Sequence, residues 1–253
     1  VHCSRRSRRS IIQKRKRMKL ATHKDGTRDG SLLVVSRDLR HAVGATHIVS
    51  NLREALERWA EFEPALRQLS DQLNAGQVPG AFEFDARELE SPLPRCSQWC
   101  DGSAYLNHAE LVRKARNAEM PQQLYSDPML YQGASDSFVG PCDPIRVAKA
   151  EWGIDLEGEV AVVTDDVPMG VSQQEAARHI KLVMIVNDVS LRNLMPAELA
   201  KGFGFFVSKP STAFSPVAVT PDELGDAWDG TKLNLPLVCH VNDELLGKPH
   251  AGV

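Results

Sequence analysis

The hydrophobic pattern of the first third of the chain predicts a small mixed domain. Within residues 18–38, two apolar segments flank Asp-Gly dipeptides, which is typical of strands joined by turns. Apolar side chains then recur at helical spacing over residues 51–62 and 64–76, so these two segments are predicted to be amphipathic helices. Asn51 and Glu54 form a candidate capping box for the first helix. The proline that opens the second segment suits the first turn of a new helix.

Strands dominate the pattern after residue 96. The run "KLVMIVNDVS" predicts a buried strand that delivers Asp188 at its end, and further strands are predicted over residues 215–220 and 235–248. "HAELVRKARNA" and "SQQEAARHI" predict short helices, the latter with Ser172 as its N-cap. The proline-punctuated segment "FEFDARELESPLPR" is typical of a linker and indicates a boundary near residue 95.

These patterns together predict a mixed α/β, β-rich chain in three parts. Residues 1–17 form a basic extension, residues 18–95 a small N-terminal domain, and residues 96–253 a larger, strand-rich domain.

Positive charge is concentrated at the N-terminus. The chain has 30 Lys and Arg against 33 Asp and Glu, yet "SRRSRRSIIQKRKR" alone holds eight of the basic residues and no acid. A basic tail on an acidic body could bind nucleic acid or act as a localisation signal. We adopt the alternative: residues 1–17 lie outside the folded protein, Met18 is the natural start, and no nucleic acid is a partner.

Composition argues against several other classes of protein. No apolar run approaches the roughly 18–20 residues of a membrane-spanning helix, so we expect a soluble, cytoplasmic protein with no membrane partner. Cys96 and Cys100 have no second Cys/His pair to complete a zinc site, so reduced thiols are expected. Gly-x-Gly-x-x-Gly, Walker and Gly-x-Ser-x-Gly patterns are absent, which removes the main support for dinucleotide, P-loop and serine-hydrolase functions.

The stretch "GIDLEGEV" places Asp155, Glu157 and Glu159 at alternate positions before the apolar run "VAVV". On a single strand all three carboxylates would point to one face. They could be solvated at a sheet edge, or they could bind a hard divalent cation, because acids that lead into a core require compensating charge. Asp101 and Asp188 stand at other element boundaries and are candidates for the same site. A metal here would be Mg²⁺ or Ca²⁺ rather than zinc, since no His/Cys cluster accompanies the acids.

A set of ordered motifs carries a resemblance to a known family. "DGSAYLNH", "YQG", "GIDLEGEVAVV", "VNDVSLRN" and "SKPSTAFSPVAV" resemble the fumarylacetoacetate hydrolase family, and closely its bacterial fumarylacetoacetases, over a region that runs from Met18 to the end of the chain. The resemblance implies a catalytic domain of the mixed β-sandwich roll type. The family continues past the position of Val253, so the resemblance also implies that the C-terminal part of the roll is missing.

The resemblance implies a role for each matched side chain. The implied metal ligands are Asp101, Glu157, Glu159 and Asp188. The implied catalytic residues are His108, which would activate water, and Lys209, beside the metal and the substrate. The implied substrate contacts are Arg116, Tyr131 and Arg192, and Thr212 is a candidate for the outer sphere of the metal. Asp155 is the acid without a matched role, either close behind the ligands or turned aside by a bulge.

The implied activity is metal-dependent hydrolysis of a carbon–carbon bond in a 1,3-diketo acid, the expected small-molecule partner. Fumarylacetoacetate would give fumarate and acetoacetate, the last step of tyrosine and phenylalanine breakdown, with Mg²⁺ or Ca²⁺ as Lewis acid and a histidine base. Acylpyruvate hydrolysis and oxaloacetate decarboxylation are alternatives within the family, and a truncated, non-catalytic protein is a third. A homodimer is expected for the full-length form.

Overall fold

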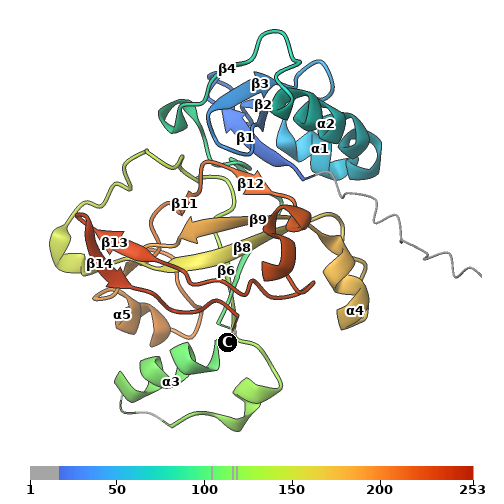
Figure 1. The fold of residues 1–253 in the computed structure, drawn as a ribbon. Helices are drawn as coiled ribbons and strands as arrows, with labels where there is room; N and C mark the ends of the chain where they lie inside the picture. The colour runs from blue at the N-terminus through green and yellow to red at the C-terminus, as the bar shows by residue number, and fades with distance from the viewer. Residues whose placement is uncertain (1–16, 104, 116, 118, 253) are drawn as a thin grey trace, which may run out of the picture.

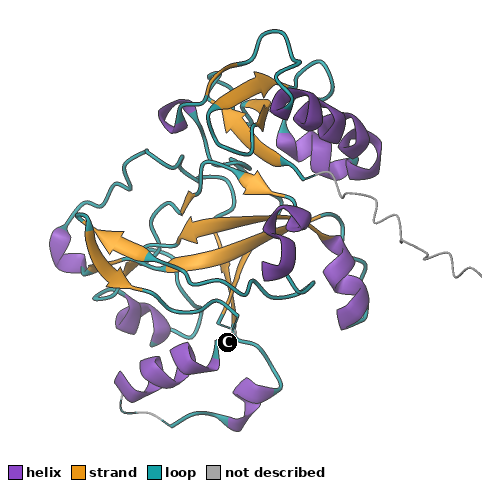
Figure 2. Ribbon diagram, in the orientation of Figure 1, coloured by secondary structure: helices purple, strands orange, loops and turns teal. Residues whose placement is uncertain are grey.

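The structure, a computed structural model, describes residues 17–252 except 104, 116 and 118. The prediction for residues 1–17 therefore lies, Arg17 apart, outside the described residues. The described chain forms an extended antiparallel sheet with helices at its periphery (Figures 1 and 2). The predicted mixed α/β, β-rich class is confirmed.

The N-terminal part is a meander of short strands covered by two helices (Figure 1). The strands are β1 (Lys19–His23), β2 (Ser31–Val35), β3 (His41–Gly44) and β4 (Phe82–Glu83), and the helices are α1 (Leu52–Glu57) and α2 (Trp59–Asn74). Strand β1 pairs with β2 in the register Leu20↔Val34, as expected for two apolar segments joined by a turn. The buried faces of the helices pack on the strands in one hydrophobic core, which also includes Leu182 and Phe214 from later in the chain.

Two helices form as predicted, but the break between them lies earlier than expected. The Asn51 side chain accepts a hydrogen bond from the Glu54 N–H at 2.9 Å, which confirms the N-cap of α1. Arg58 has φ −132° and ψ 40°, so the helix is interrupted there and α2 begins at Trp59. Pro64 lies inside α2 rather than opening it, because the helix already begins at Trp59; there its ring removes one backbone hydrogen bond and crowds the preceding turn.

Strand β12 (Ala218–Val219) joins the N-terminal strands to those of the larger part. It pairs with β1 on one side and with β9 (Ile180–Asn187) on the other. The sheet order is β11-β9-β12-β1-β2-β3-β4, with β8 (Gly158–Thr164) also paired to β9 and β11 spanning Ala213–Phe214. Segments far apart in the chain therefore share one sheet, in which β9 pairs with β8, β11 and β12.

Shorter pairs of strands complete the larger part. They are β5 (Trp99–Gly102) with β6 (Leu130–Gly133), β7 (Ile154–Asp155) with β10 (Ser190–Leu191), and β13 (Cys239–Val241) with β14 (Glu244–Gly247). The helices are α3 (Leu106–Ala115), α4 (Gln173–Ala176) and α5 (Met195–Leu199). The predicted turn after β13 is confirmed, since Asn242 and Asp243 both have positive φ, 50° and 66°, as a type I′ hairpin requires. Ser172 caps α4 as predicted.

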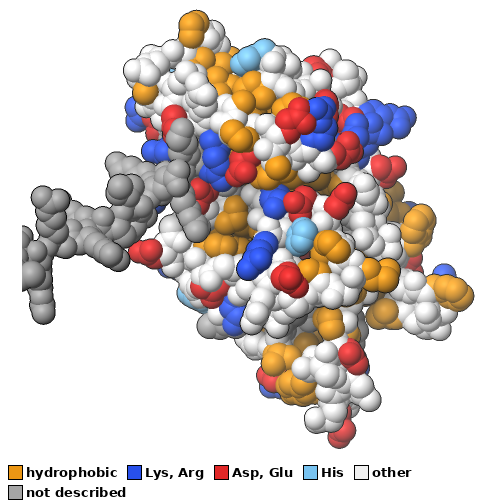
Figure 3. All heavy atoms as spheres, turned by 90° about the vertical axis from the view of Figure 1, so that its right-hand side faces the viewer, with side chains coloured by type: hydrophobic (Ala, Val, Ile, Leu, Met, Phe, Trp, Pro, Cys, Tyr) orange, Lys and Arg blue, Asp and Glu red, His pale blue; other side chains and the backbone are white. Residues whose placement is uncertain are grey.

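The surface carries intermingled charge. On the face shown in Figure 3, basic and acidic side chains lie side by side over the N-terminal part. Ion pairs such as Arg53–Glu57 and Arg58–Glu61 occur on its helices. Within the described ranges, no helix is both long and apolar enough to cross a membrane. The cysteines there, Cys96, Cys100, Cys142 and Cys239, are free thiols.

Candidate active site

A cavity of about 1320 Å³ lies beside β5, β6, β8 and α3. Predicted site residues that line it are Asp101, His108, Tyr131, Glu157, Glu159, Arg192 and Lys209. Asp188 and Thr212 are buried and join this group through hydrogen bonds to it and to each other. The structure thus gathers these predicted residues in one neighbourhood. Arg116, a predicted substrate contact, lies outside the described residues.

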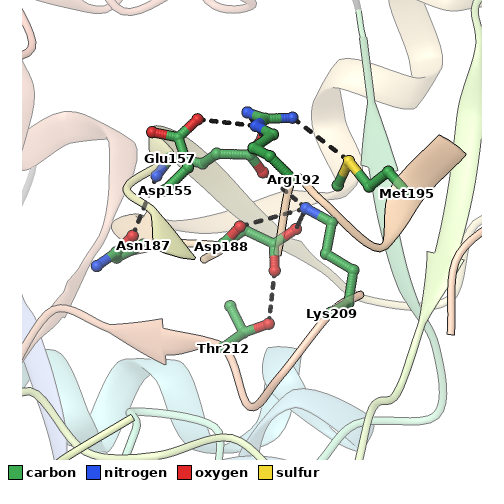
Figure 4. Close-up of polar contacts among 8 residues, drawn as sticks. All are labelled: Asp155, Glu157, Asn187, Asp188, Arg192, Met195, Lys209 and Thr212. Atoms are coloured by element: carbon green, nitrogen blue, oxygen red, sulfur yellow. Dashed lines mark hydrogen bonds and ion pairs between the residues drawn. The ribbon is translucent and has the colours of Figure 1, made fainter. Parts of the chain in front are cut away.

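Lys209 is the centre of the polar network (Figure 4). Its Nζ lies 2.6 Å from Glu157 Oε2 and 2.8 Å from Asp188 Oδ2, and it also donates to the Asp188 carbonyl at 3.2 Å. Thr212 Oγ1 donates to the other oxygen of Asp188 at 2.7 Å. The Asp188 side chain is only 1% exposed, so this ammonium and hydroxyl supply the compensation that a buried carboxylate requires.

The strand that carries the three alternating acids is interrupted, contrary to the expectation of a single face. Strand β7 ends at Asp155, which pairs with Ser190 of β10, and β8 begins only at Gly158. Glu157 lies in the gap, where its N–H donates to Asn187 Oδ1 at 3.2 Å and its carbonyl accepts from the Asp188 N–H at 3.0 Å. The polar end of β9 therefore holds Glu157 toward Lys209 independently of strand alternation.

Arg192 connects the unmatched Asp155 to the site. Its Nε donates to Asp155 Oδ2 at 2.7 Å, and its Nη2 pairs with Glu157 (Figure 4). Burial lowers the pKa of Arg192, but the hydrogen bond to Asp155 and the charge of Glu157 outweigh it and raise that pKa overall. Asp155 is half-exposed and faces Arg192, so in this structure it orients a cation rather than joining the other carboxylates.

Asp101 and Glu159 lie close enough to this network for its charges to act on them, and the pKa of each is raised. Burial, together with the charges of Asp101, Asp188 and Glu157, raises the pKa of Glu159 to about 8. Burial is also the largest cause of a raised pKa at Asp101, which lies on β5 opposite Tyr131. The charges of Glu157, just before β8, and of Asp188, just after β9, contribute to both raised pKa values, so the predicted metal ligands lie close enough to repel one another.

His108, on α3, and Tyr131, on β6, both line the cavity. His108 lies in the first turn of α3, where it is exposed and close enough to Asp101 for its charge to lower the pKa of that carboxyl. The Tyr131 ring packs edge-on against the Phe205 ring, with 5.4 Å between the ring centroids. The centroid of the Tyr131 ring lies 5.8 Å from Lys209 Nζ. An imidazole, an ammonium and a phenol hydroxyl group thus line the same cavity.

The chemistry of the donors fits a hard divalent cation. The four predicted ligands are all carboxylates, and Lys209 and Arg192 balance only part of their charge. In the part of the chain that the structure describes, no three His, Cys, Asp or Glu side chains are grouped as a metal site requires. Instead, the Lys209 ammonium lies between Glu157 and Asp188. The carboxylates would therefore have to converge around an ion as it binds.

Three residues with clear structural roles at the site were not predicted. Asn187 holds the backbone of Glu157, Phe205 packs on Tyr131, and Glu198 binds the backbone just before Lys209. Asn187 directly precedes Asp188 in the quoted segment "VNDVSLRN", so its place beside a predicted metal ligand could have indicated a role at the site. The sequence offered no such indication for Glu198, because most of its hydrogen-bond donors are backbone N–H groups, which the sequence does not distinguish.

Comparison with known families identifies the class to which this fold and site belong. Residues 18–95 match the profile described as fumarylacetoacetase N-terminal domain 2, and residues 97–251 match the fumarylacetoacetate hydrolase C-terminal profile. The chain belongs to the fumarylacetoacetate hydrolase family. The predicted family is confirmed, whereas its bacterial fumarylacetoacetase members are not singled out by the relatives that follow.

Curated relatives match part of the chain. A mitochondrial oxaloacetate tautomerase of Xenopus laevis is 27% identical over 150 residues, which cover 58% of this chain and 42% of that protein. An oxaloacetate tautomerase of Bacillus subtilis is 27% identical over 153 residues, covering 58% and 49%. A 2,4-didehydro-3-deoxy-L-rhamnonate hydrolase of Sphingomonas is 34% identical over 107 residues, covering 41% and 36%. The matched region thus spans less than half of the length of each relative.

Solved structures share the fold at low identity. A fumarylacetoacetate hydrolase from Exiguobacterium antarcticum has a TM-score of 0.62 at 23% identity, over 92% of this chain and 75% of that one. A maleylpyruvate hydrolase from Sphingobium, in complex with manganese(II) and pyruvate, has a TM-score of 0.61 at 16% identity, over 92% and 76%. These likenesses establish the architecture.

The raised pKa of Glu159 predicts a pH-dependent penalty on folding. The pKa of about 8 in the folded protein lies above the ordinary glutamate pKa of 4.5, so the folded protein retains a proton that the unfolded chain has released between these two pH values. Stability should therefore fall as pH rises through this window. Glu159→Gln removes the group, so the melting temperature of the variant relative to wild type should increase from pH 4.5 to 8 and then level off. Thermal melts in EDTA measure this, and a difference that does not vary with pH would contradict it.

Divalent metal should stabilise the protein through Asp101. At 100 times its Kd, a ligand that binds only the folded state stabilises by about 2.7 kcal/mol, so Mg²⁺, Ca²⁺ or Mn²⁺ should raise the melting temperature. Asp101→Asn should remove most of this shift. Asp155→Asn is the matched control, because it makes the same change in an acid that faces Arg192, and it should keep the shift. Equal shifts in both variants would exclude Asp101 as a ligand.

Proposed function

We propose that the protein is a divalent-metal-dependent enzyme that interconverts the keto and enol forms of a short 2-oxo dicarboxylic acid of the oxaloacetate type. The observation that carries this proposal is the cluster of Glu157, Asp188 and Lys209 beside a cavity that His108 also lines. The tautomerases among its relatives favour this reaction. The manganese(II) and pyruvate held by the Sphingobium enzyme support a 2-oxo acid and a divalent ion as the ligands.

Hydrolysis of a 1,3-diketo acid, either fumarylacetoacetate or an acylpyruvate, is the second candidate. The hydrolase relative of Sphingomonas and the family itself favour it. Decarboxylation of oxaloacetate belongs with the first candidate, since it also passes through an enolate. The homodimer and the cytoplasmic location stay predictions from the family resemblance.

Lys209 would act as a fixed cation rather than as a base. Burial lowers its pKa, but the charges of Asp188 and Glu157 outweigh burial, so the pKa is raised overall and the side chain stays protonated. An ammonium held in place by two carboxylates can stabilise negative charge on an enolate oxygen without having to reorient. A bound Mg²⁺, Ca²⁺ or Mn²⁺ would polarise the keto oxygen of the substrate as a Lewis acid.

His108 would move the proton. Imidazole is the side-chain type that exchanges protons near neutral pH, and His108 is exposed in the cavity lining. For tautomerisation it would take a proton from the carbon next to the keto group and deliver it to the enolate oxygen, which gives the enol. For hydrolysis it would instead deprotonate a water molecule. Tyr131 and Arg192 are the proposed substrate contacts within the described residues, and Arg116 a further one outside them.

A direct comparison of substrates separates the two candidates. Purified protein with Mg²⁺ or Mn²⁺ is assayed for loss of enol-oxaloacetate absorbance, for pyruvate formation, and for cleavage of fumarylacetoacetate and an acylpyruvate. We expect faster tautomerisation of oxaloacetate than cleavage of either diketo acid. Cleavage of fumarylacetoacetate without any effect on oxaloacetate would reverse the order of the two candidates.

Replacing His108 tests the proposed base. His108→Ala should lower kcat roughly 10²–10⁴-fold, the usual contribution of a positioned acid–base group. The metal-dependent rise in melting temperature should survive, because the carboxylates remain. His240→Ala is the control, since His240 is exposed on β13 and is not among the described residues that line the cavity. A His108→Ala protein that keeps most of its turnover would refute the assignment.

A further inference from the structure

Glu198, at the end of α5, binds the backbone of a turn together with one hydroxyl of that turn. Its carboxylate accepts hydrogen bonds from the Val207 N–H at 2.7 Å and the Ser208 N–H at 3.0 Å. It also accepts from the Ser208 hydroxyl at 2.5 Å and from the Phe206 N–H at 3.2 Å. One carboxylate thus binds three consecutive residues, 206–208, immediately before Lys209.

The carboxylate is held in its charged form. Burial raises the pKa of Glu198, but the hydrogen bonds from the Ser208 hydroxyl and from the N–H groups of Val207, Phe206 and Ser208 outweigh it and lower the pKa to about 2. Hydrogen bonds to an ionised acceptor are roughly twice as strong as those between neutral groups. The hydrogen bonds from residues 206–208 to the Glu198 carboxylate are therefore retained across the range of pH in which enzymes work.

Apolar packing contributes little to holding this segment. The side chains of Phe203, Phe206 and Val207 are 98%, 84% and 58% exposed. Gly202 and Gly204 have positive φ, 76° and 90°, a conformation that costs glycine little and leaves the segment without side chains there. A segment with few buried contacts is expected to open easily unless polar contacts anchor it. Glu198 provides such an anchor.

The anchored turn carries two groups into the site. Phe205 packs against the ring of Tyr131, and the Lys209 ammonium lies between Glu157 and Asp188. Ser208 between them is fully buried, and its carbonyl accepts from the Leu191 N–H at 2.8 Å. A long lysine side chain loses substantial rotamer freedom when it is fixed, so the backbone on which it stands must itself be held.

We propose that Glu198 is a positioning residue, whose carboxylate fixes the 206–208 turn and thereby sets the Lys209 ammonium against Glu157 and Asp188. It is not a catalytic residue, since its oxygens are engaged by the turn and it is not part of the described lining of the cavity. The kinetic consequence rests on the proposed function, because it requires that Lys209 stabilise the reacting enolate. The positioning of the Lys209 side chain by Glu198 does not depend on the proposed function.

The kinetic test is a double-mutant cycle. Glu198→Ala should lower kcat about 10- to 100-fold with little change in KM, because small displacements of a catalytic group can cost this much. In a Lys209→Met background, Glu198→Ala should change kcat less than about twofold, since the two residues act as one unit. Equal losses in both backgrounds would overturn the proposal. Glu175→Ala is the control: Glu175 also binds backbone, in the capping box of α4, and its loss should leave kcat unchanged.

A test without turnover follows the reactivity of Lys209. The Lys209 side chain is 7% exposed when Glu198 binds the 206–208 turn. Reductive methylation, quantified by peptide mass spectrometry, should modify Lys209 slowly in wild type and Glu175→Ala, and at least about tenfold faster in Glu198→Ala, as expected for release of a locally ordered segment. Glu198→Gln, which keeps one acceptor oxygen, should be intermediate and serves if the alanine variant does not fold.

The outcomes distinguish the two hypotheses. If wild type turns over no substrate, the proposed function fails, and the labelling result alone decides whether Glu198 positions Lys209. If Lys209 remains protected in folded Glu198→Ala and Glu198→Gln proteins, the positioning role is refuted whatever the enzyme acts on.

Discussion

The site depends on one buried ammonium that is shared by two carboxylates. Transfer of charged groups out of water costs several kcal/mol for each ion, so Lys209, Glu157 and Asp188 can be buried only together. Their contact joins three places in the fold: the break before β8, the end of β9, and the turn before β11. Thr212 and Asn187 strengthen this junction with hydrogen bonds to the Asp188 carboxylate and the Glu157 backbone.

Burial, together with the carboxylate charges of the same cluster, raises the pKa of Asp101 and of Glu159. A protein selected for stability alone would pair these acids or replace them, because burial and mutual repulsion disfavour their charged forms. Strongly perturbed carboxyl groups that face a cavity are typical of functional sites. A divalent cation would favour their deprotonated forms and offset the mutual repulsion, and this supports the metal that the proposed reaction requires.

Features that depend on local sequence were predicted well. Asn51 capping a helix, the hairpin turn at Asn242 and the delivery of Asp188 by an apolar strand each follow from neighbouring residues. The failures involve contacts that are distant in sequence. The alternating acids were interpreted as one strand, but pairing of Asp155 with Ser190 ends β7 early. The break between α1 and α2 lies at Arg58, where no proline or glycine marks it.

The arrangement of elements explains how one family can host several reactions. Glu157, Asp188 and Lys209 lie at the ends of strands of the main sheet or in the turns beside them, whereas His108 lies on α3, a helix outside the sheet (Figure 1). Under the proposed function, only the carboxylates and Lys209 would be needed to stabilise an enolate. Whether a carbon-bound proton or a water molecule is deprotonated would depend on where the His108 imidazole lies relative to the substrate. Changes in α3 would then alter the reaction while the buried charge cluster stays intact.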